Sequence, residues 1–162
     1  MTRDSRYDIF FEPVRIGPVT AKNRFYQVPH CNGTGYRYPH TQAAMRGIKA
    51  EGGWAVVNTE WCSVHPSSDT TLTANVRLRT DEDGRTNALM TETVHRYDAL
   101  AGCELAHAGL YAHNRYTRIP AMGPSICTQP LEDSPGQDRA MDKTDLRAIR
   151  PLVPVRRQQE GH

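Results

Sequence analysis

The chain contains no apolar run of the ~20 residues that a transmembrane helix needs, and residues 1–17 (MTRDSRYDIFFEPVRIG) contain no signal-peptide core. A strong excess of one charge is also missing, since the formal net charge is only +2. Nucleic acids and anionic membranes attract proteins with a marked basic excess, so neither is expected as a partner. We therefore expect a globular, cytoplasmic protein.

Paired CxxC motifs are absent as well. The four cysteines, Cys31, Cys62, Cys103 and Cys127, stand far apart in the sequence. Thiols in a reducing compartment stay reduced, so a disulfide framework is not expected. Each cysteine needs its own explanation.

One alternative use of these cysteines is a zinc site. The spacing Cys62-x-x-His65 suits zinc, and an adjacent His-Cys pair could supply two more ligands. The complete candidate set is His30, Cys31, Cys62 and His65. The adjacent pair is an awkward chelate, and neither HExxH nor CxxC is present, so zinc is the lesser alternative.

Strand and helix patterns alternate along the chain. Residues 10–26 predict a small hairpin that leads into a first strand, and Gly52-Gly53 marks the end of a first helix. A Ser/Thr/Asp-rich loop is expected over residues 63–87. The expected strands are 25–29, 54–61 and 103–107, and the expected helices are 41–50 and 87–100.

The second expected strand, WAVVNTEW, begins with a nearly continuous apolar run, which is typical of a parallel sheet covered on both faces. No GxGxxG follows a strand, so a dinucleotide-binding open sheet has no support. Polar and reactive residues stand at the C-terminal ends of all three strands, where a barrel builds its active site. These residues are His30 and Cys31; Glu60, Trp61 and Cys62; Glu104 and His107. The predicted fold is α/β, the N-terminal portion of a (β/α)8 TIM barrel with about three strands.

Four segments in order carry a resemblance to a known family: FEPVRIGPVTAKNRFYQVPHCNG, AEGGWAVVNTEWCSVHP, LAGCELAHAG, and NRYTR with the later GPS. Together they resemble the N-terminal part of the old yellow enzyme family of FMN-dependent TIM barrels, and most of all its trimethylamine and dimethylamine dehydrogenase branch. The resemblance runs from about Tyr7 to Ile149. It implies oxidation of a C–H bond next to a substituted nitrogen, with a hydride equivalent passing to flavin N5. A small alkylated amine or betaine is the implied substrate.

For Cys31 the resemblance implies a covalent role, a thioether to the C6 atom of FMN. The chemistry is reasonable, because a thiolate is a strong nucleophile and the isoalloxazine ring is electron-poor. Two alternatives stay open: FMN bound without a covalent bond, and a small buried cysteine with a packing role only.

Other positions carry implied roles as well. Val28, Pro29 and His30 correspond to residues that line the flavin, and Cys62 to a neighbour of the ring. Trp61 is implied to belong to the flavin site as well, and it falls where the amine dehydrogenase branch places an aromatic beside the substrate. A cation–π contact there would contribute about 0.5–2 kcal/mol. A tryptophan that only packs in the core is the alternative.

On the third strand, Glu104 stands where a carboxylate could accept a hydrogen bond from flavin N3–H. His107 is expected to be a hydrogen-bonded structural histidine rather than a base.

The length of the chain conflicts with a complete barrel, which needs ~250 residues. Residues 1–150 are expected to form the N-terminal part of the FMN-binding barrel. A helix that starts near Lys143 should stop near Arg150, because Pro151 and Pro154 follow. Residues 151–162 are then an aberrant tail outside the family pattern.

The later strands of the family carry its substrate-activating residues, and the iron–sulfur cysteines lie further on. No catalytic residue is therefore assigned in this chain, and an iron–sulfur cluster is expected only in the missing part. Two hypotheses remain: a truncated FMN-dependent oxidoreductase, and a catalytically silent fragment or half-barrel that needs a separately encoded partner. Open strand edges predict marginal stability in isolation.

Overall fold

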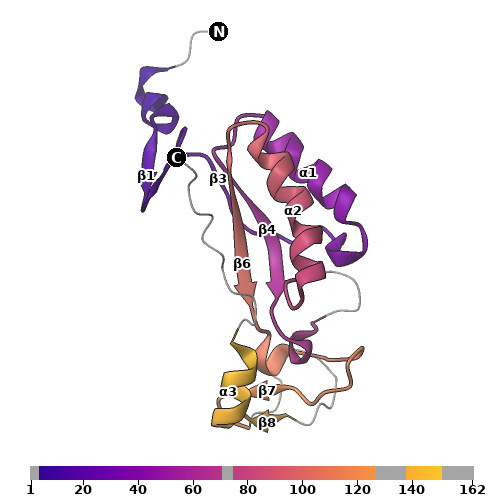
Figure 1. Cartoon of the computed structure of the whole chain (residues 1–162). Coiled ribbons are helices and arrows are strands. Elements are labelled where there is room, and N and C mark those ends of the chain that lie inside the picture. The colour runs from indigo at the N-terminus through magenta and orange to yellow at the C-terminus, as the bar shows by residue number, and fades with distance from the viewer. Residues whose placement is uncertain (1–3, 71–74, 127–137, 151–162) are drawn as a thin grey trace.

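The computed structural model describes residues 4–70, 75–126 and 138–150. The chain begins with a short 3-10 helix, η1 (Ser5–Phe11), and an antiparallel hairpin of β1 (Val14–Ile16) and β2 (Val19–Ala21), which confirms the expected hairpin (Figure 1). Gly17 turns this hairpin with a φ of 58°, a left-handed conformation that glycine adopts without strain.

A parallel sheet forms the centre of the molecule. The long strand β4 (Val56–Ser63) pairs with β3 (Tyr26–Gln27) near its beginning and with β6 (Leu100–Ala106) along most of its length. A short strand, β5 (Val76–Arg77), pairs with the last two residues of β4. All of these pairs are parallel, as the apolar pattern predicted, and β4 is buried along nearly its whole length.

Two helices, α1 (Pro39–Glu51) and α2 (Asp81–His95), lie on the same side of the sheet (Figure 1). Small side chains on α1 let the helices approach β4 closely. The buried core between the helices and the sheet consists of Ala43, Ala50, Val57, Met90, Val94 and Ala99. Among the described residues, no helix covers the opposite side, and none is long and apolar enough to span a membrane.

The second helix starts and ends earlier than the expected range of 87–100. It starts at Asp81 because Thr80 and Asp83 form a capping box, in which each side chain accepts a hydrogen bond from the other residue's backbone N–H. Acidic residues in its first turn also stabilise the helix, because their negative charge interacts favourably with the positive end of the helix dipole. The helix then ends at His95, and the third strand starts at Leu100 rather than Cys103. The expected loop 63–87 accordingly contains β5 and a 3-10 helix, η3 (Pro66–Ser68).

Short elements gather at the end of the sheet towards which β4 and β6 point (Figure 1). They are the 3-10 helices η2 (Gly35–Arg37), which leads into α1, and η4 (Gly109–Tyr111), with β7 (Met122–Gly123), β8 (Arg139–Ala140) and α3 (Lys143–Ile149). The predicted stop of the last helix near Arg150 is confirmed. The predicted tail, residues 151–162, lies outside the described residues.

Asn58 ties the three main strands together. Its backbone N–H donates to Gln27 Oε1 over 3.2 Å, and its side-chain amide donates to the Gln27 carbonyl. The Tyr26 hydroxyl donates to Asn58 Oδ1 over 3.2 Å. On the other side, a Cβ atom at Gly102 would lie 1.9 Å from Asn58 Oδ1, so the amide occupies the space that a side chain on β6 would need.

We predict that Gly102→Ala lowers the free energy of unfolding by about 1–3 kcal/mol, because the added methyl group forces Asn58 out of this network. The matched control is Gly84→Ala on α2, where a Cβ atom would meet nothing within 4 Å. This control should be stabilised by about 0.5–1 kcal/mol through helix propensity. Urea unfolding followed by circular dichroism measures both. Equal stability of the two variants would contradict the role of Asn58.

Candidate functional site

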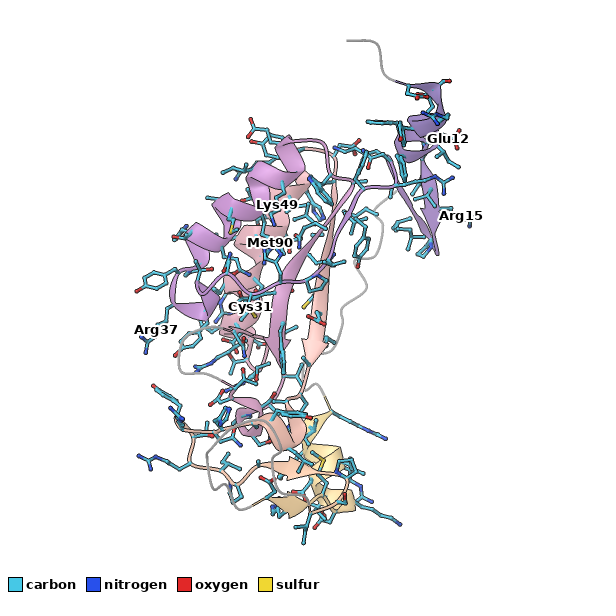
Figure 2. All side chains as sticks on the ribbon, turned by 180° about the vertical axis from the view of Figure 1, so that it is seen from behind. Glu12, Arg15, Cys31, Arg37, Lys49 and Met90 are labelled. Carbon is cyan, nitrogen blue, oxygen red and sulfur yellow. The ribbon has the colours of Figure 1, made fainter. Side chains whose placement is uncertain are left out.

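The C-terminal ends of β3, β4 and β6 meet at one place. Cys31 follows β3, on the segment that leads into α1 (Figure 2). Trp61 on β4 is directly opposite Glu104 on β6 in the strand register. The Cys31 sulfur is influenced both by the Trp61 backbone N–H, which favours the thiolate, and by the Glu104 carboxylate, which opposes it. The structure thus brings together three of the predicted site residues from three adjacent strands.

The Cys31 thiol donates to Asn75 Oδ1 over 3.4 Å. Cys31 is exposed, so it is not the small buried cysteine of the packing alternative. Partial burial of its sulfur still raises the pKa of Cys31, and the nearby Glu60 carboxylate raises it further. The thiol therefore stays protonated at neutral pH in the absence of a partner. An electron-poor or cationic group placed beside the sulfur would favour the thiolate.

His30 is held by the buried guanidinium of Arg46. Arg46 Nη2 donates to the His30 carbonyl over 2.7 Å, and Nη1 lies 3.1 Å from His30 Nδ1. Burial lowers the pKa of His30, and the positive charge of Arg46 lowers it further, so the ring is neutral near pH 7. The Lys49 ammonium, 3.2 Å from Nε2, acts in the same direction. These contacts fix the end of β3 against α1.

The two residues before His30 differ in what they offer a ligand. Val28 is 64% exposed, an unusual amount for an aliphatic residue directly after a strand of the central sheet. Its carbonyl accepts from the side-chain amide of Gln27, which keeps the backbone in place. Pro29 is half-buried. The Val28 side chain is thus an apolar surface available for contact.

The sequence indicated that Glu60 lies towards the end of its strand, but assigned it no role in the site. Its side chain is fully buried, and Oε2 accepts the backbone N–H of Asn32 over 3.2 Å. Within the part of the chain that the structure describes, Oε1 has no hydrogen-bond partner. Burial raises the pKa of Glu60, while the Asn32 N–H and the Arg46 charge lower it in part. Glu60 therefore anchors the segment that follows Cys31. A charged residue inside an otherwise buried strand was the signal in the sequence.

Trp61 packs against the small residues Ala108, Ala112 and Ala121 around η4. Its indole N–H is buried and has no hydrogen-bond partner among the described residues. Buried polar groups are usually paired, so this donor is suited to a ligand or a bound water. The position of Trp61 is compatible with both hypotheses, packing in the core and contact with a ligand.

The remaining predicted residues have different surroundings. Glu104 is exposed, and its backbone N–H donates to Thr59 Oγ1 over 3.4 Å. Cys62 is fully buried, with its sulfur 3.2 Å from Thr59 Oγ1 and 3.3 Å from the Cys103 sulfur. His107 Nε2 lies 2.9 Å from the Ser67 hydroxyl, and Nδ1 accepts the Gly109 N–H, as expected for a structural histidine.

The zinc alternative finds no support. Each of its four residues has other partners: His30 contacts Arg46, Cys31 contacts Asn75, Cys62 contacts Cys103, and His65 contacts Ser67. Within the ranges that the structure describes, no three His, Cys, Asp or Glu side chains are grouped so that they could hold a metal ion.

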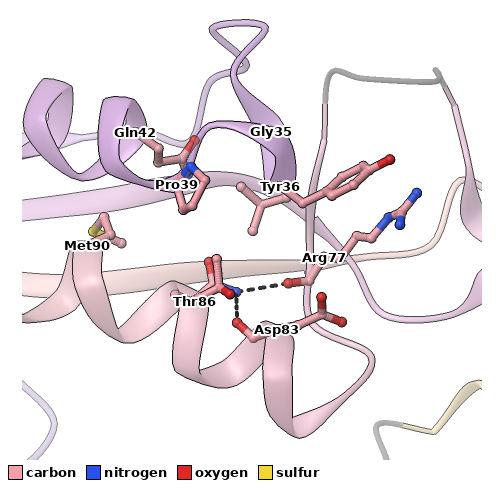
Figure 3. A pocket seen from close by; sticks show the side chains of 10 residues that line it. Gly35, Tyr36, Pro39, Gln42, Arg77, Asp83, Thr86 and Met90 are labelled. Atoms are coloured by element: carbon pink, nitrogen blue, oxygen red, sulfur yellow. Dashed lines mark hydrogen bonds between the residues drawn. The ribbon is translucent and has the colours of Figure 1, made fainter.

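One cavity between α1, β5 and α2 is too small for a cofactor. Its volume is about 10 Å³, room for a single water molecule at most. Asn87 is among its lining residues and donates to the carbonyls of Arg77 and Asp83, both over 2.9 Å. Arg77 and Asp83 are labelled in Figure 3. A larger cavity of about 510 Å³ lies between η3, the start of α2 and α3, and is lined by His65, Arg79 and Arg150 among others.

We predict that Glu60→Gln accelerates alkylation of Cys31 roughly three- to tenfold at pH 8. The variant removes the carboxylate that opposes the thiolate, so the pKa of Cys31 falls, while the glutamine oxygen can still accept the Asn32 N–H. The rate is measured with iodoacetamide and peptide mass spectrometry.

Two controls separate this charge effect from unfolding. Glu82→Gln removes an exposed carboxylate that pairs with Arg85 on α2, and it should leave the Cys31 rate unchanged. Buried Cys62 should stay unmodified in both variants. A Cys31 rate in Glu60→Gln equal to that of the original chain would rule out the proposed influence of Glu60.

Several solved structures have a fold similar to that of this chain. Histamine dehydrogenase from Rhizobium sp. 4-9 is 49% identical with a TM-score of 0.84, and the match covers 90% of this chain and 22% of that one. The 6-hydroxypseudooxynicotine amine oxidase of Pseudomonas geniculata N1 is 40% identical with the same TM-score and the same coverage. The old yellow enzyme homologue from Zymomonas mobilis, at 19% identity and a TM-score of 0.70, shares the fold. The architecture is therefore part of a TIM barrel, as predicted.

Comparison of the sequence with known proteins supports the same relationship. Dimethylamine dehydrogenase from Hyphomicrobium sp. (strain x) is 47% identical over 136 residues, which are 84% of this chain and 18% of that enzyme. This chain spans about a fifth of the length of such relatives. Residues 9–150 match the model of the NADH:flavin oxidoreductase / NADH oxidase family. The chain belongs to this family, the old yellow enzyme family of FMN-dependent oxidoreductases.

Proposed function

We propose that this chain supplies the first three strand ends of an FMN site in an amine-oxidising enzyme. The observation that carries the proposal is the convergence of Cys31, Trp61 and Glu104 at the ends of adjacent parallel strands. Ligands of parallel α/β folds bind at this end of the strands. The identity of nearly half to dimethylamine dehydrogenase and histamine dehydrogenase supports an amine as the substrate.

The residues present fit one side of a flavin ring. The exposed side chain of Val28 offers an apolar contact beside Pro29, and the neutral ring of His30 continues this surface. Glu104 is an acceptor only and suits the N3–H group of the ring. Cys31 would supply the sulfur of a thioether, and Cys62 on β4 would be a neighbour of the ring. FMN, when bound, supplies the acceptor for a hydride equivalent.

Trp61 is the residue of this chain that would meet the substrate. An aromatic face attracts an alkylated ammonium group. The indole N–H is a donor only, so its partner would be an acceptor atom of the flavin or a bound water rather than the ammonium group. The proposed substrate is therefore a small amine, held so that the C–H bond next to nitrogen faces the flavin. None of the residues named here acts as a base or holds an iron–sulfur cluster. Those functions are proposed for other parts of the enzyme.

A second candidate is a half-barrel that binds FMN only together with a second polypeptide. The exposed apolar side chains of Tyr26, Val28 and Leu105 on the sheet favour it, because a complete barrel would cover such surface. The experiment below distinguishes the two candidates.

We predict that the chain mixed with FMN keeps a flavin absorbance band in the pellet after acid precipitation, because the bond to Cys31 survives denaturation. In Cys31→Ala the band should move to the supernatant, and Cys103→Ala is the matched control that should keep it. A band that stays in the Cys31→Ala pellet would contradict the attachment site. A colourless chain whose melting temperature FMN does not change would contradict the first candidate and favour the half-barrel.

A further inference from the structure

Two thiols lie side by side on neighbouring strands of the central sheet. The sulfur atoms of Cys62 on β4 and Cys103 on β6 are 3.3 Å apart. Cys62 is fully buried, whereas Cys103 is exposed. The pair therefore has one sulfur that a reagent can reach and one that only its neighbour can reach.

The strand register explains how these sulfurs meet. Asn58 pairs with Gly102, but Trp61 pairs with Glu104, so β4 has an extra residue in the ladder between these points. Such a bulge re-aims the side chains beside it. It brings Cys62 next to Cys103, although the regular register of Cys62 is opposite Leu105. A disulfide bond is about 2.0 Å long, so the sulfurs need to approach by about 1.3 Å to form one.

The two thiols differ in acidity as well as in exposure. The hydrogen bond between the two sulfurs lowers the pKa of Cys103 to about 7. A hydrogen bond with Thr59 also lowers this pKa, whereas burial and the Glu104 charge raise it. The contact with Cys103, burial and the Glu60 charge raise the pKa of Cys62. Cys103 is thus the thiol that ionises first, with Cys62 as its proton-bearing neighbour.

We propose that Cys62 and Cys103 form a dithiol site that reacts with small organic disulfides and is converted to an intramolecular disulfide. The Cys103 thiolate attacks one sulfur of the reagent, whose S–S bond breaks, and the thiolate that leaves takes up the proton lost by Cys103. The Cys62 sulfur then attacks the Cys103 sulfur and breaks the mixed disulfide. The second leaving thiolate takes the Cys62 proton. The two protein thiols lose two electrons, and the reagent becomes two thiols.

Disulfide formation between Cys62 and Cys103 does not depend on flavin binding, but it would affect the proposed flavin site. A bond between Cys62 and Cys103 would cross-link β4 and β6 beside Trp61 and Glu104. Such a bond would restrict how far the two strand ends can separate.

The test treats the complete chain with 2-hydroxyethyl disulfide near neutral pH, blocks the remaining thiols with N-ethylmaleimide, and maps tryptic peptides without reduction. Cleavage after Lys49, Arg77, Arg96 and Arg115 places the two cysteines on separate peptides, 50–77 and 97–115. We expect these peptides to be linked in large excess over any other pairing of the four cysteines. The same reaction in concentrated urea should lose this preference.

Two variants test the order of the steps. Cys62→Ser should stop at a mixed disulfide on Cys103, formed faster than any adduct on Cys31. Cys103→Ser should leave buried Cys62 unmodified. The proposal is overturned by a pairing pattern that is the same with and without urea, or by Cys31 reacting before Cys103 in Cys62→Ser. The assay contains no FMN, so its failure would leave the proposed flavin site unaffected.

Discussion

The parallel pairing of β4 with β3 and β6 is the constraint on which the rest of the structure depends. Parallel strands end at the same edge of a sheet, so residues far apart in the sequence come together there without any direct link. Asn58 holds this arrangement by bonding to Gln27 and Tyr26 on β3 and by filling the space above Gly102 on β6. Because Cys31, Trp61 and Glu104 lie beyond this point on the same three segments, their proximity follows from it.

The candidate site contains charges of both signs, and they influence one another. The cations of Arg46 and Lys49 surround His30 on the side of α1, and the carboxylates of Glu60 and Glu104 act on Cys31 from the sheet. Arg46 and Glu60 are both fully buried, which is costly unless their polar atoms are paired, and one nitrogen of Arg46 and one oxygen of Glu60 are not. Ionisable groups in such surroundings are common where a protein binds a ligand.

Much of this architecture could be predicted from the sequence, because apolar periodicity and strand-end chemistry are local signals. The parallel sheet, the hairpin and the end of the last helix near Arg150 all follow from them. The start of α2 was missed because its capping box lies in a polar stretch that has the composition of a loop. The hydrogen bond from Asn32 to Glu60 and the contact between Cys62 and Cys103 could not be predicted either. The first depends on the path of the chain after Cys31, and the second on a bulge in β4.

The central claim is that the strand ends of this chain hold one side of a flavin. The most direct test is a titration of the 15N-labelled chain with FMN, followed through the indole N–H signals of its two tryptophans. Trp61 has an unpaired indole N–H at the proposed site, whereas Trp54 packs against Phe25 before β4 begins and serves as the internal reference. The account predicts that FMN shifts the Trp61 signal and leaves the Trp54 signal in place. Equal shifts of both signals, or a shift of Trp54 alone, would contradict it.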